Sequence, residues 1–359
     1  TAQGGSLMPP EVLQAMQSAA GSYVSLRALQ DAAGRRIAEV IGAPAAVVSS
    51  GAAGAILLGV AGALTGTEVS KIHELPETAA GARNQILVWR AARPNYMYQA
   101  CQAAGGKLVE VGALGGAVTP EAFRDALRDR VAAVLLVLAP IDQARDRLGG
   151  WPEFVGGIAR AAAERGVPVL IDAASELPPR ALVRQLLELG VSGVIVSGGK
   201  AIRGPQSTGL LLGQPDLIGA AALNNNPLSA IGRPMKVGKE ELCGLVVAVE
   251  RFFAMDEAAQ LAAWHGAAGE IAGAVSHGRG VRAEVLAGHP DFGRPPLVPK
   301  AVLHFAGDAA RAAAVADRLT EGDPAIHPLR QGEYLIFNPM TLEAGEPEVV
   351  ADRLRSALG

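Results

Sequence analysis

Short apolar runs that alternate with helix-like segments constrain the fold of this chain more than any other feature. The runs are rich in Val, Leu and Ile, and near-continuous apolar strands of this kind are typical of sheets that are buried on both faces. The alternation therefore predicts an α/β fold with a mainly parallel seven-stranded sheet and helices on both of its faces. The expected strands lie at residues 46–49, 86–89, 107–111, 131–138, 167–171, 191–197 and 208–213.

The segments around these strands indicate three parts of the chain. Residues 1–45 are expected to form an N-terminal helical segment, and residues 46–256 form the large domain that contains the sheet. From about residue 275 onward strands mix with helices over a shorter length, so residues 257–359 are expected to form a small C-terminal α+β domain. The expected helices of the large domain lie at residues 52–64, 94–104, 119–129, 152–165, 180–189 and 238–256.

Composition and charge exclude several classes of protein. The formal net charge is −3, whereas a nucleic-acid-binding surface needs an excess of Lys and Arg. Residues 40–67 carry no charge and are long enough to span a bilayer, but six glycines and Pro44 interrupt them, so we expect a strand, a turn and a buried helix instead. The two cysteines, Cys101 and Cys243, are too few for a disulfide framework. These features favour a cytoplasmic protein without a membrane or nucleic-acid partner.

Lys200 is the sharpest candidate for chemistry in the sequence. In VIVSGGKAIRGPQSTGLLLG, residues 194–213, an apolar strand ends at Ser197 and two glycines precede the lysine. The carboxyl end of a strand is where α/β sheets bind their ligands, and glycines allow the backbone to approach a ligand closely. An amine nucleophile must be partly desolvated to be neutral near pH 7, and Arg203 is close enough in sequence to help lower its pKa. A glycine loop with a solvated lysine is the alternative.

Two further motifs are expected at the same edge of the sheet. Asp172 ends the strand of VPVLIDAASELPP, and a carboxylate there is costly unless it is paired. A protonated pyridine nitrogen is a suitable partner, because an aspartate keeps such a ring an electron sink. The turn SSGAA, residues 49–53, joins a strand to a helix, and its free N–H groups and hydroxyls suit a phosphate. An N-cap aspartate and an ordinary strand-to-helix turn are the alternatives.

Phosphate turn, aspartate and lysine follow one another in the order found in fold-type I enzymes that use pyridoxal 5'-phosphate (PLP), and the chain resembles their selenocysteine-synthase-like branch. That branch includes amino sugar acid ammonia lyases and tRNA-dependent selenium transferases. The resemblance implies PLP as the cofactor, Lys200 as its Schiff-base lysine and Asp172 as the partner of the pyridine nitrogen. It also implies a phosphate site formed by Ser50, Gly51, Ala52, Ala53 and Ser197. The matching stretches, which cover essentially the whole chain, are GGSLMPPEVLQAM, SSGAAGAILLG, AGGKLVEVG, VLIDAASELPP, SGGKAIRGPQSTG and AIGRPMKVGKEELCGLVVAVE.

Several positions bear on the substrate. Arg93 stands where the lyase-like pattern carries a histidine that stacks on the cofactor ring, and its planar guanidinium can stack in the same way. Arg203, Arg233 and Lys236 are candidates for binding a substrate carboxylate or phosphate, and a solvated basic helix start is the alternative for the last two. The six histidines show no metal-ligand spacing, so no metal is expected. Tyr96 and Tyr98 are expected either to line the pocket or to pack in the core.

Together these features predict an enzyme that acts at the α-carbon of an amino acid or amino sugar acid. Lys200 is expected to remove the α-proton, and β-elimination with release of ammonia is expected ahead of racemisation or transamination. A tRNA-dependent, selenium-transferase-like protein is the alternative of another class, but it needs a basic surface and an N-terminal extension. A homodimer or larger symmetric assembly is expected, because fold-type I sites usually lie at a subunit boundary.

Overall fold

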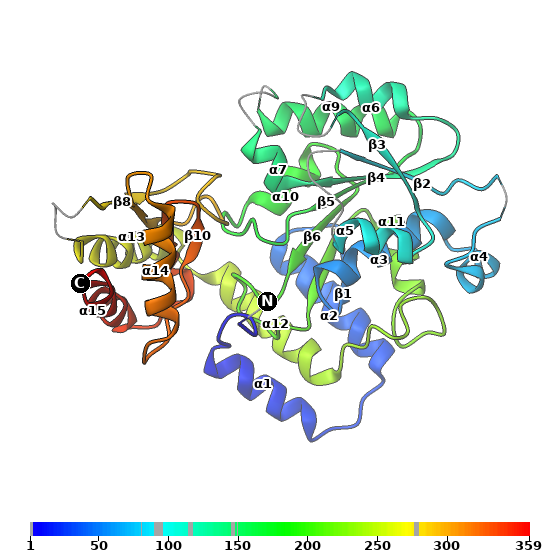
Figure 1. Cartoon of the computed structure of the whole chain (residues 1–359). Helices are drawn as coiled ribbons and strands as arrows, with labels where there is room; N and C mark the ends of the chain where they lie inside the picture. The colour runs from blue at the N-terminus through cyan, green and yellow to red at the C-terminus, as the bar shows by residue number, and fades with distance from the viewer. Residues whose placement is uncertain are drawn as a thin grey trace. The chain divides into compact units, whose positions relative to one another are not determined.

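The computed structural model describes residues 3–79, 81–89, 96–113, 118–144, 148, 150–275 and 280–359. The chain divides into two compact units, Thr1–Ala254 and Met255–Gly359 (Figure 1). The first unit includes the helices α1 (Pro10–Ala20) and α2 (Leu26–Ile41), which the sequence led us to expect as a segment of their own. Both helices pack against α12 (Lys239–Ala254), and this packing joins them to the larger unit.

A seven-stranded sheet forms the centre of the first unit, in the order β1-β7-β6-β5-β4-β2-β3. Strand β7 runs antiparallel to both of its neighbours, and the remaining pairs are parallel. The expected α/β fold with a mainly parallel seven-stranded sheet is therefore confirmed. The strands are β1 (Ala45–Ser49), β2 (Gln85–Trp89), β3 (Lys107–Val111), β4 (Val131–Val137), β5 (Val169–Asp172), β6 (Gly193–Ser197) and β7 (Gly209–Gly213).

Helices cover the sheet on both faces. Helix α3 (Ala52–Thr65) carries no charged residue and is buried along most of its length, as expected for a helix in the middle of a large core. It shares an apolar core with α5 (Tyr96–Ala103), α11 (Pro215–Leu223) and alternate residues of the strands, such as Val88. The next residue of β2, Trp89, packs on Phe154 with ring centroids 6.0 Å apart, so α9 (Trp151–Ala163) covers the opposite face.

Four shorter helices complete the first unit. They are α4 (Val69–Glu74), α6 (Pro120–Ala126), α7 (Leu138–Gln143) and α10 (Leu182–Glu188). Helix α6 packs on α9, and α10 packs on β6. Among the described residues, no helix combines the length and the apolar character needed to cross a membrane.

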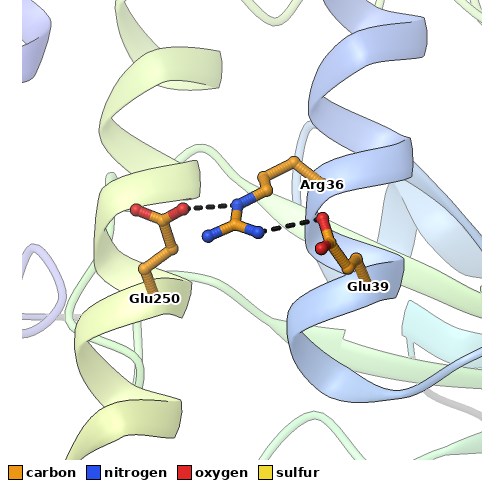
Figure 2. A network of polar contacts seen from close by, with 3 residues as sticks. All are labelled: Arg36, Glu39 and Glu250. Carbon is orange, nitrogen blue, oxygen red and sulfur yellow. Dashed lines mark hydrogen bonds and ion pairs between the residues drawn. The ribbon is translucent and has the colours of Figure 1, made fainter.

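A small polar network also links α2 to α12 (Figure 2). Arg36 donates from Nε to Glu250 on α12 at 2.6 Å and from a terminal nitrogen to Glu39 on its own helix at 2.9 Å. All three side chains are substantially exposed, so water and salt screen the network and it contributes little to stability. The buried apolar residues of α2, among them Ile37 and Ile41, are the main source of its attachment.

The second unit contains a four-stranded antiparallel sheet in the order β10-β11-β9-β8, with helices packed on it. Its apolar core includes Leu303 and Phe337 from the sheet and Val315 and Leu354 from the helices. This unit is the small α+β domain that the sequence predicts. Its elements are α13 (Glu257–Gly273), β8 (Arg282–Leu286), β9 (Lys300–His304), α14 (Ala309–Thr320), β10 (Leu329–Gln331), β11 (Tyr334–Phe337), a 3-10 helix (Pro339–Thr341) and α15 (Glu346–Leu358).

Candidate active site

The sheet brings the three motifs to one edge. Strands β1 and β6 both run antiparallel to β7, so they point the same way, and β5 is parallel to β6. Ser49 and Ser197, the last residues of β1 and β6, both lie opposite Gly209 at the start of β7. The turns that follow β1, β5 and β6 therefore leave from the same edge, as α/β sheets require of a ligand site.

Lys200 leaves the turn after β6 and reaches the turn after β5. Its side chain is half-buried, and Nζ donates a hydrogen bond to Oγ of Ser175 at 2.7 Å. Burial lowers the pKa of Lys200, and the negative charge of Asp172 acts in the opposite direction. The net shift makes the neutral, nucleophilic amine more abundant near neutral pH than it is for a solvated lysine. The sequence analysis missed Ser175, whose position three residues after Asp172 was the only signal.

Asp172 is buried at the end of β5 with 4% of its surface exposed. One carboxylate oxygen accepts from the backbone N–H of Ala174 at 3.0 Å, and the other accepts from the hydroxyl of Tyr96 at 3.3 Å. Burial raises the pKa of Asp172, while the Ala174 N–H, the charge of Lys200 and the Tyr96 hydroxyl each lower it. A carboxylate that its surroundings disfavour in this way is well placed to pair with a buried cation of a ligand.

A cavity of about 290 Å³ opens beside these residues. Asp172, Ser175 and Tyr96 line it, together with Tyr98, whose hydroxyl donates to the backbone oxygen of Trp89 at 3.1 Å. Both tyrosines that the sequence singled out therefore line this cavity. Glu176, which is buried and which the sequence analysis did not single out, lines it as well. The other lining residues are Trp89, Met97, Leu135, Val137, Ala139, Pro140, Gln143 and Ala174.

The turn between β1 and α3 has the form of an anion site. Oγ of Ser49 donates to the backbone oxygen of Gly51 at 2.8 Å, and Gly51 has φ of 123°, which favours glycine. The first N–H groups of α3 have no acceptor within the helix and lie at its positive end. A Cβ on Gly209 would lie 2.3 Å from the carbonyl carbon of Gly51, so only a glycine allows β7 to pack this closely under the turn.

The remaining predicted site residues differ in their burial and in their hydrogen-bond partners. Ser197 is half-buried at the end of β6, whereas Arg203 donates from Nε to the backbone oxygen of Leu7 at 2.8 Å. Arg233 donates to the backbone oxygen of Pro227 at 2.5 Å, and Lys236 is exposed.

The loop that carries these two basic residues runs close to the start of α3. The sulfur of Met235 lies 3.4 Å from where a Cβ on Gly54 would be. The described residues that line the cavity do not include Arg203, Arg233 or Lys236. Their binding of substrate therefore stays a prediction. Arg93 lies outside the described residues. Within the described part of the chain, no group of three or more His, Cys, Asp or Glu side chains is arranged to hold a metal ion.

The donor set at this edge is specific in its chemistry. It offers a helix N-terminus for a phosphate, a buried carboxylate for a ring cation, and an amine of lowered pKa for an electrophilic carbonyl. PLP carries all three groups, so the residues present fit this cofactor.

The sequence has relatives that cover its full length, although no family model matches it. It is 30% identical to 5'-C-glycyluridine monooxygenase-decarboxylase of Streptomyces sp, over 100% of this chain and 88% of that protein. It is 28% identical to D-glucosaminate-6-phosphate ammonia lyase of Salmonella typhimurium, over 99% of this chain and 92% of that protein. L-seryl-tRNA(Sec) selenium transferase of Serratia proteamaculans is 28% identical over 67% of this chain and 52% of its own length.

Solved structures with a similar fold include enzymes of the same kind as the sequence relatives. The structure of D-glucosaminate-6-phosphate ammonia-lyase superposes with a TM-score of 0.77 at 25% identity, covering 99% of this chain and 93% of that one. The serine palmitoyltransferase of Sphingomonas wittichii, at 13% identity and a TM-score of 0.60, shares the fold. Because the full-length relationship and the superposition agree with the resemblance of the lysine segment, this chain belongs to the selenocysteine-synthase-like branch of the fold-type I PLP-dependent enzymes.

Proposed function

We propose that this enzyme acts at the α-carbon of an amino acid or amino sugar acid and releases ammonia by β-elimination. One observation carries the proposal: the Lys200 amine, of lowered pKa, bonds at 2.7 Å to Ser175 on the wall of the cavity that Asp172 also lines. An amine and a buried carboxylate beside one cavity are what proton removal next to a ring cation requires.

Each proposed residue has a distinct task toward the cofactor. Lys200 would hold PLP covalently through its amine, and Asp172 would pair with its protonated ring nitrogen. The turn from Ser50 to Ala53, with Ser197, would hold the phosphate, and Arg93 would contribute a planar guanidinium for the ring. When bound, PLP supplies an electron sink that stabilises the carbanion left by loss of the α-proton.

The residues of the chain then perform the acid–base steps. The Lys200 amine would serve as the base, because burial disfavours its ammonium form. Ser175 holds this amine at the wall of the cavity, so the proton moves from the substrate α-carbon to Nζ. A leaving group on the β-carbon then departs, and hydrolysis yields ammonia and a keto acid.

The relatives support a substrate with a sugar-derived chain. The names D-glucosaminate-6-phosphate and 5'-C-glycyluridine both describe an amino acid unit attached to such a chain. A second function, oxidative decarboxylation, is favoured by the 30% identity to the monooxygenase-decarboxylase over the whole chain. We also propose a cytoplasmic location and a homodimer, and light scattering of the purified protein tests the homodimer.

The test begins with the cofactor and ends with the products. PLP should give the protein a visible absorption band, and borohydride should fix the cofactor on Lys200. D-amino acids, L-amino acids and sugar amino acids are then screened for a change in that band. A true substrate should exchange its α-hydrogen in deuterated water and release ammonia and a keto acid.

The alternative reactions leave different products. Oxygen uptake with release of carbon dioxide would identify the decarboxylase reaction instead of elimination. A need for an amino acceptor would identify an aminotransferase, and a change of chirality alone would identify a racemase. A label on another lysine would refute the assignment of Lys200 itself.

A further inference from the structure

Residues 5–7, which we call the strap, lie directly on the turn that carries Lys200. The backbone N–H of Ser6 donates to the backbone oxygen of Gly199 at 3.1 Å. The hydroxyl of Ser6 donates to the backbone oxygen of Lys200 at 2.9 Å, although the two residues are 194 positions apart in sequence. One serine therefore bonds to the carbonyl groups on both sides of the Lys200 amide nitrogen and α-carbon.

Arg203 holds the strap from the other side of the same turn. Its Nε donates to the backbone oxygen of Leu7 at 2.8 Å, and its backbone N–H donates to the oxygen of Lys200 at 2.9 Å. Arg203 has φ of 58°, in the left-handed region that a non-glycine residue enters only when its surroundings hold it there. The contacts on both sides of its backbone provide that constraint.

The strap is tightly packed and is anchored at its far end. Gly5 has φ of 92°, which favours glycine, and a Cβ there would lie 3.2 Å from the backbone oxygen of Gly199, so the strap packs closely on the lysine turn. Helix α1 follows the strap and packs on α12, with Glu11 and Arg251 joined at 2.8 Å. The position of the strap is therefore fixed both at the lysine turn and at α1.

We propose that the strap and Arg203 are positioning elements for Lys200, which aim its side chain at Ser175 and the cavity. The inference rests on the proposed role of Lys200 as the cofactor lysine. It assigns Arg203 to the lysine turn instead of to the substrate, because its guanidinium already binds the strap. Ser6 and Arg203 do not touch the reacting atoms, so they act through the lysine backbone.

Two test variants, one rescue variant and one control separate the positioning of Lys200 from a general effect on stability. Ser6→Ala removes one hydrogen bond to the Lys200 carbonyl, and Ser6→Thr keeps the hydroxyl. Arg203→Asn removes the guanidinium but tolerates the left-handed conformation, so it adds no backbone strain. Arg36→Ala is the matched control, because it breaks exposed pairs that link α2 to α12 without touching α1 or the strap.

The first readout uses the protein without cofactor. Loss of the Arg203 guanidinium bond to the strap should make the Ser6 amide exchange with deuterium about two- to tenfold faster in Arg203→Asn. An amine-reactive reagent should modify Lys200 at a different rate in Ser6→Ala and Arg203→Asn than in wild type. Mass spectrometry maps the modified lysine at each pH. Ser6→Thr should restore the wild-type rate, and Arg36→Ala should leave it unchanged.

The second readout uses the rate at which PLP is captured, followed by borohydride labelling. Ser6→Ala and Arg203→Asn should capture PLP about two- to tenfold more slowly than wild type, with the label still on Lys200. If the label is on Lys200 and both variants keep the wild-type Lys200 reactivity and capture rate, the positioning role of the strap is refuted and the proposed function stands. A label on another lysine would overturn both.

Discussion

Replacement of Asp172 by Asn tests the electrostatic core of the site, because it changes charge and almost nothing else. The Asn side chain has the same shape, so its oxygen can still accept from the N–H of Ala174. Its amide nitrogen can donate to the hydroxyl of Tyr96, which turns to accept in place of donating. PLP should still bind, because Lys200 and the phosphate turn are unchanged.

The expected loss of activity follows from the hydrogen bond to the ring nitrogen. A hydrogen bond to a charged group contributes about 1.5–3 kcal/mol, and each ~1.4 kcal/mol is about tenfold in rate. Asp172→Asn should therefore slow α-hydrogen exchange about ten- to hundredfold, measured by NMR or mass spectrometry in deuterated water. Asp142→Asn, which changes another buried carboxyl of the same unit that does not line the cavity, is the control.

The same substitution should stabilise the protein without cofactor at high pH. Burial raises the pKa of Asp172 above its ordinary value of 3.8, so the folded state binds a proton more tightly than the unfolded state does. Wild-type stability is therefore lost as pH rises from about the ordinary pKa through the raised one, and Asn escapes this loss. Thermal unfolding at pH 8 should favour Asp172→Asn, and the advantage should vanish near pH 3. Near-normal exchange would refute the role of the carboxylate, and a destabilised variant at pH 8 would refute the electrostatic argument.

Three further predictions address other parts of the site. Ser175→Ala should weaken PLP binding about two- to tenfold in an absorbance titration, because the lysine amine loses its hydroxyl partner, and Ser175→Thr should restore it. Gly209→Ala should displace the phosphate turn and abolish PLP binding, whereas Gly219→Ala, which meets no atom within 4 Å, should bind PLP normally and raise the melting temperature. Tyr96→Phe removes a donor that lowers the pKa of the aspartate, so the acid limb of the pH–rate profile should move to higher pH. Tyr98→Phe lines the same cavity and should leave that limb unchanged.

The strands could be predicted from the sequence because each is a short apolar run bounded by turn residues. Element boundaries were less certain where the apolar character continues beyond the strand. The run 131–138 predicts one strand, but β4 ends at Val137 and Leu138 begins α7. Apolar residues suit either element in a buried position, so periodicity alone does not separate them. Helix α13 was missed despite Asp256, whose side chain accepts from the N–H of Ala259 at 3.1 Å as an N-cap.

The partners of the site residues depend on packing that no local pattern encodes. Lys200 and Asp172 could be placed at one edge from the sequence because Asp172 ends β5 and Lys200 lies three residues after the end of β6, and parallel strands bring their carboxyl ends together. Ser175 is 25 positions from Lys200, and Tyr96 is 76 positions from Asp172. Such contacts appear only when the turns are placed in three dimensions, so the sequence could suggest the tyrosine as a pocket residue without its partner.

The glycines around Lys200 serve packing first and the cofactor second. A Cβ on Gly198 would lie 2.1 Å from the hydroxyl of Thr208, and one on Gly199 would lie 2.7 Å from the backbone Cα of Gln206. These distances are shorter than any real contact, so both positions require glycine even without a ligand. The motif is therefore a requirement for closing the turn after β6 against β7. The proposed chemistry of this turn resides in Lys200, whose basicity is set by burial and by Asp172.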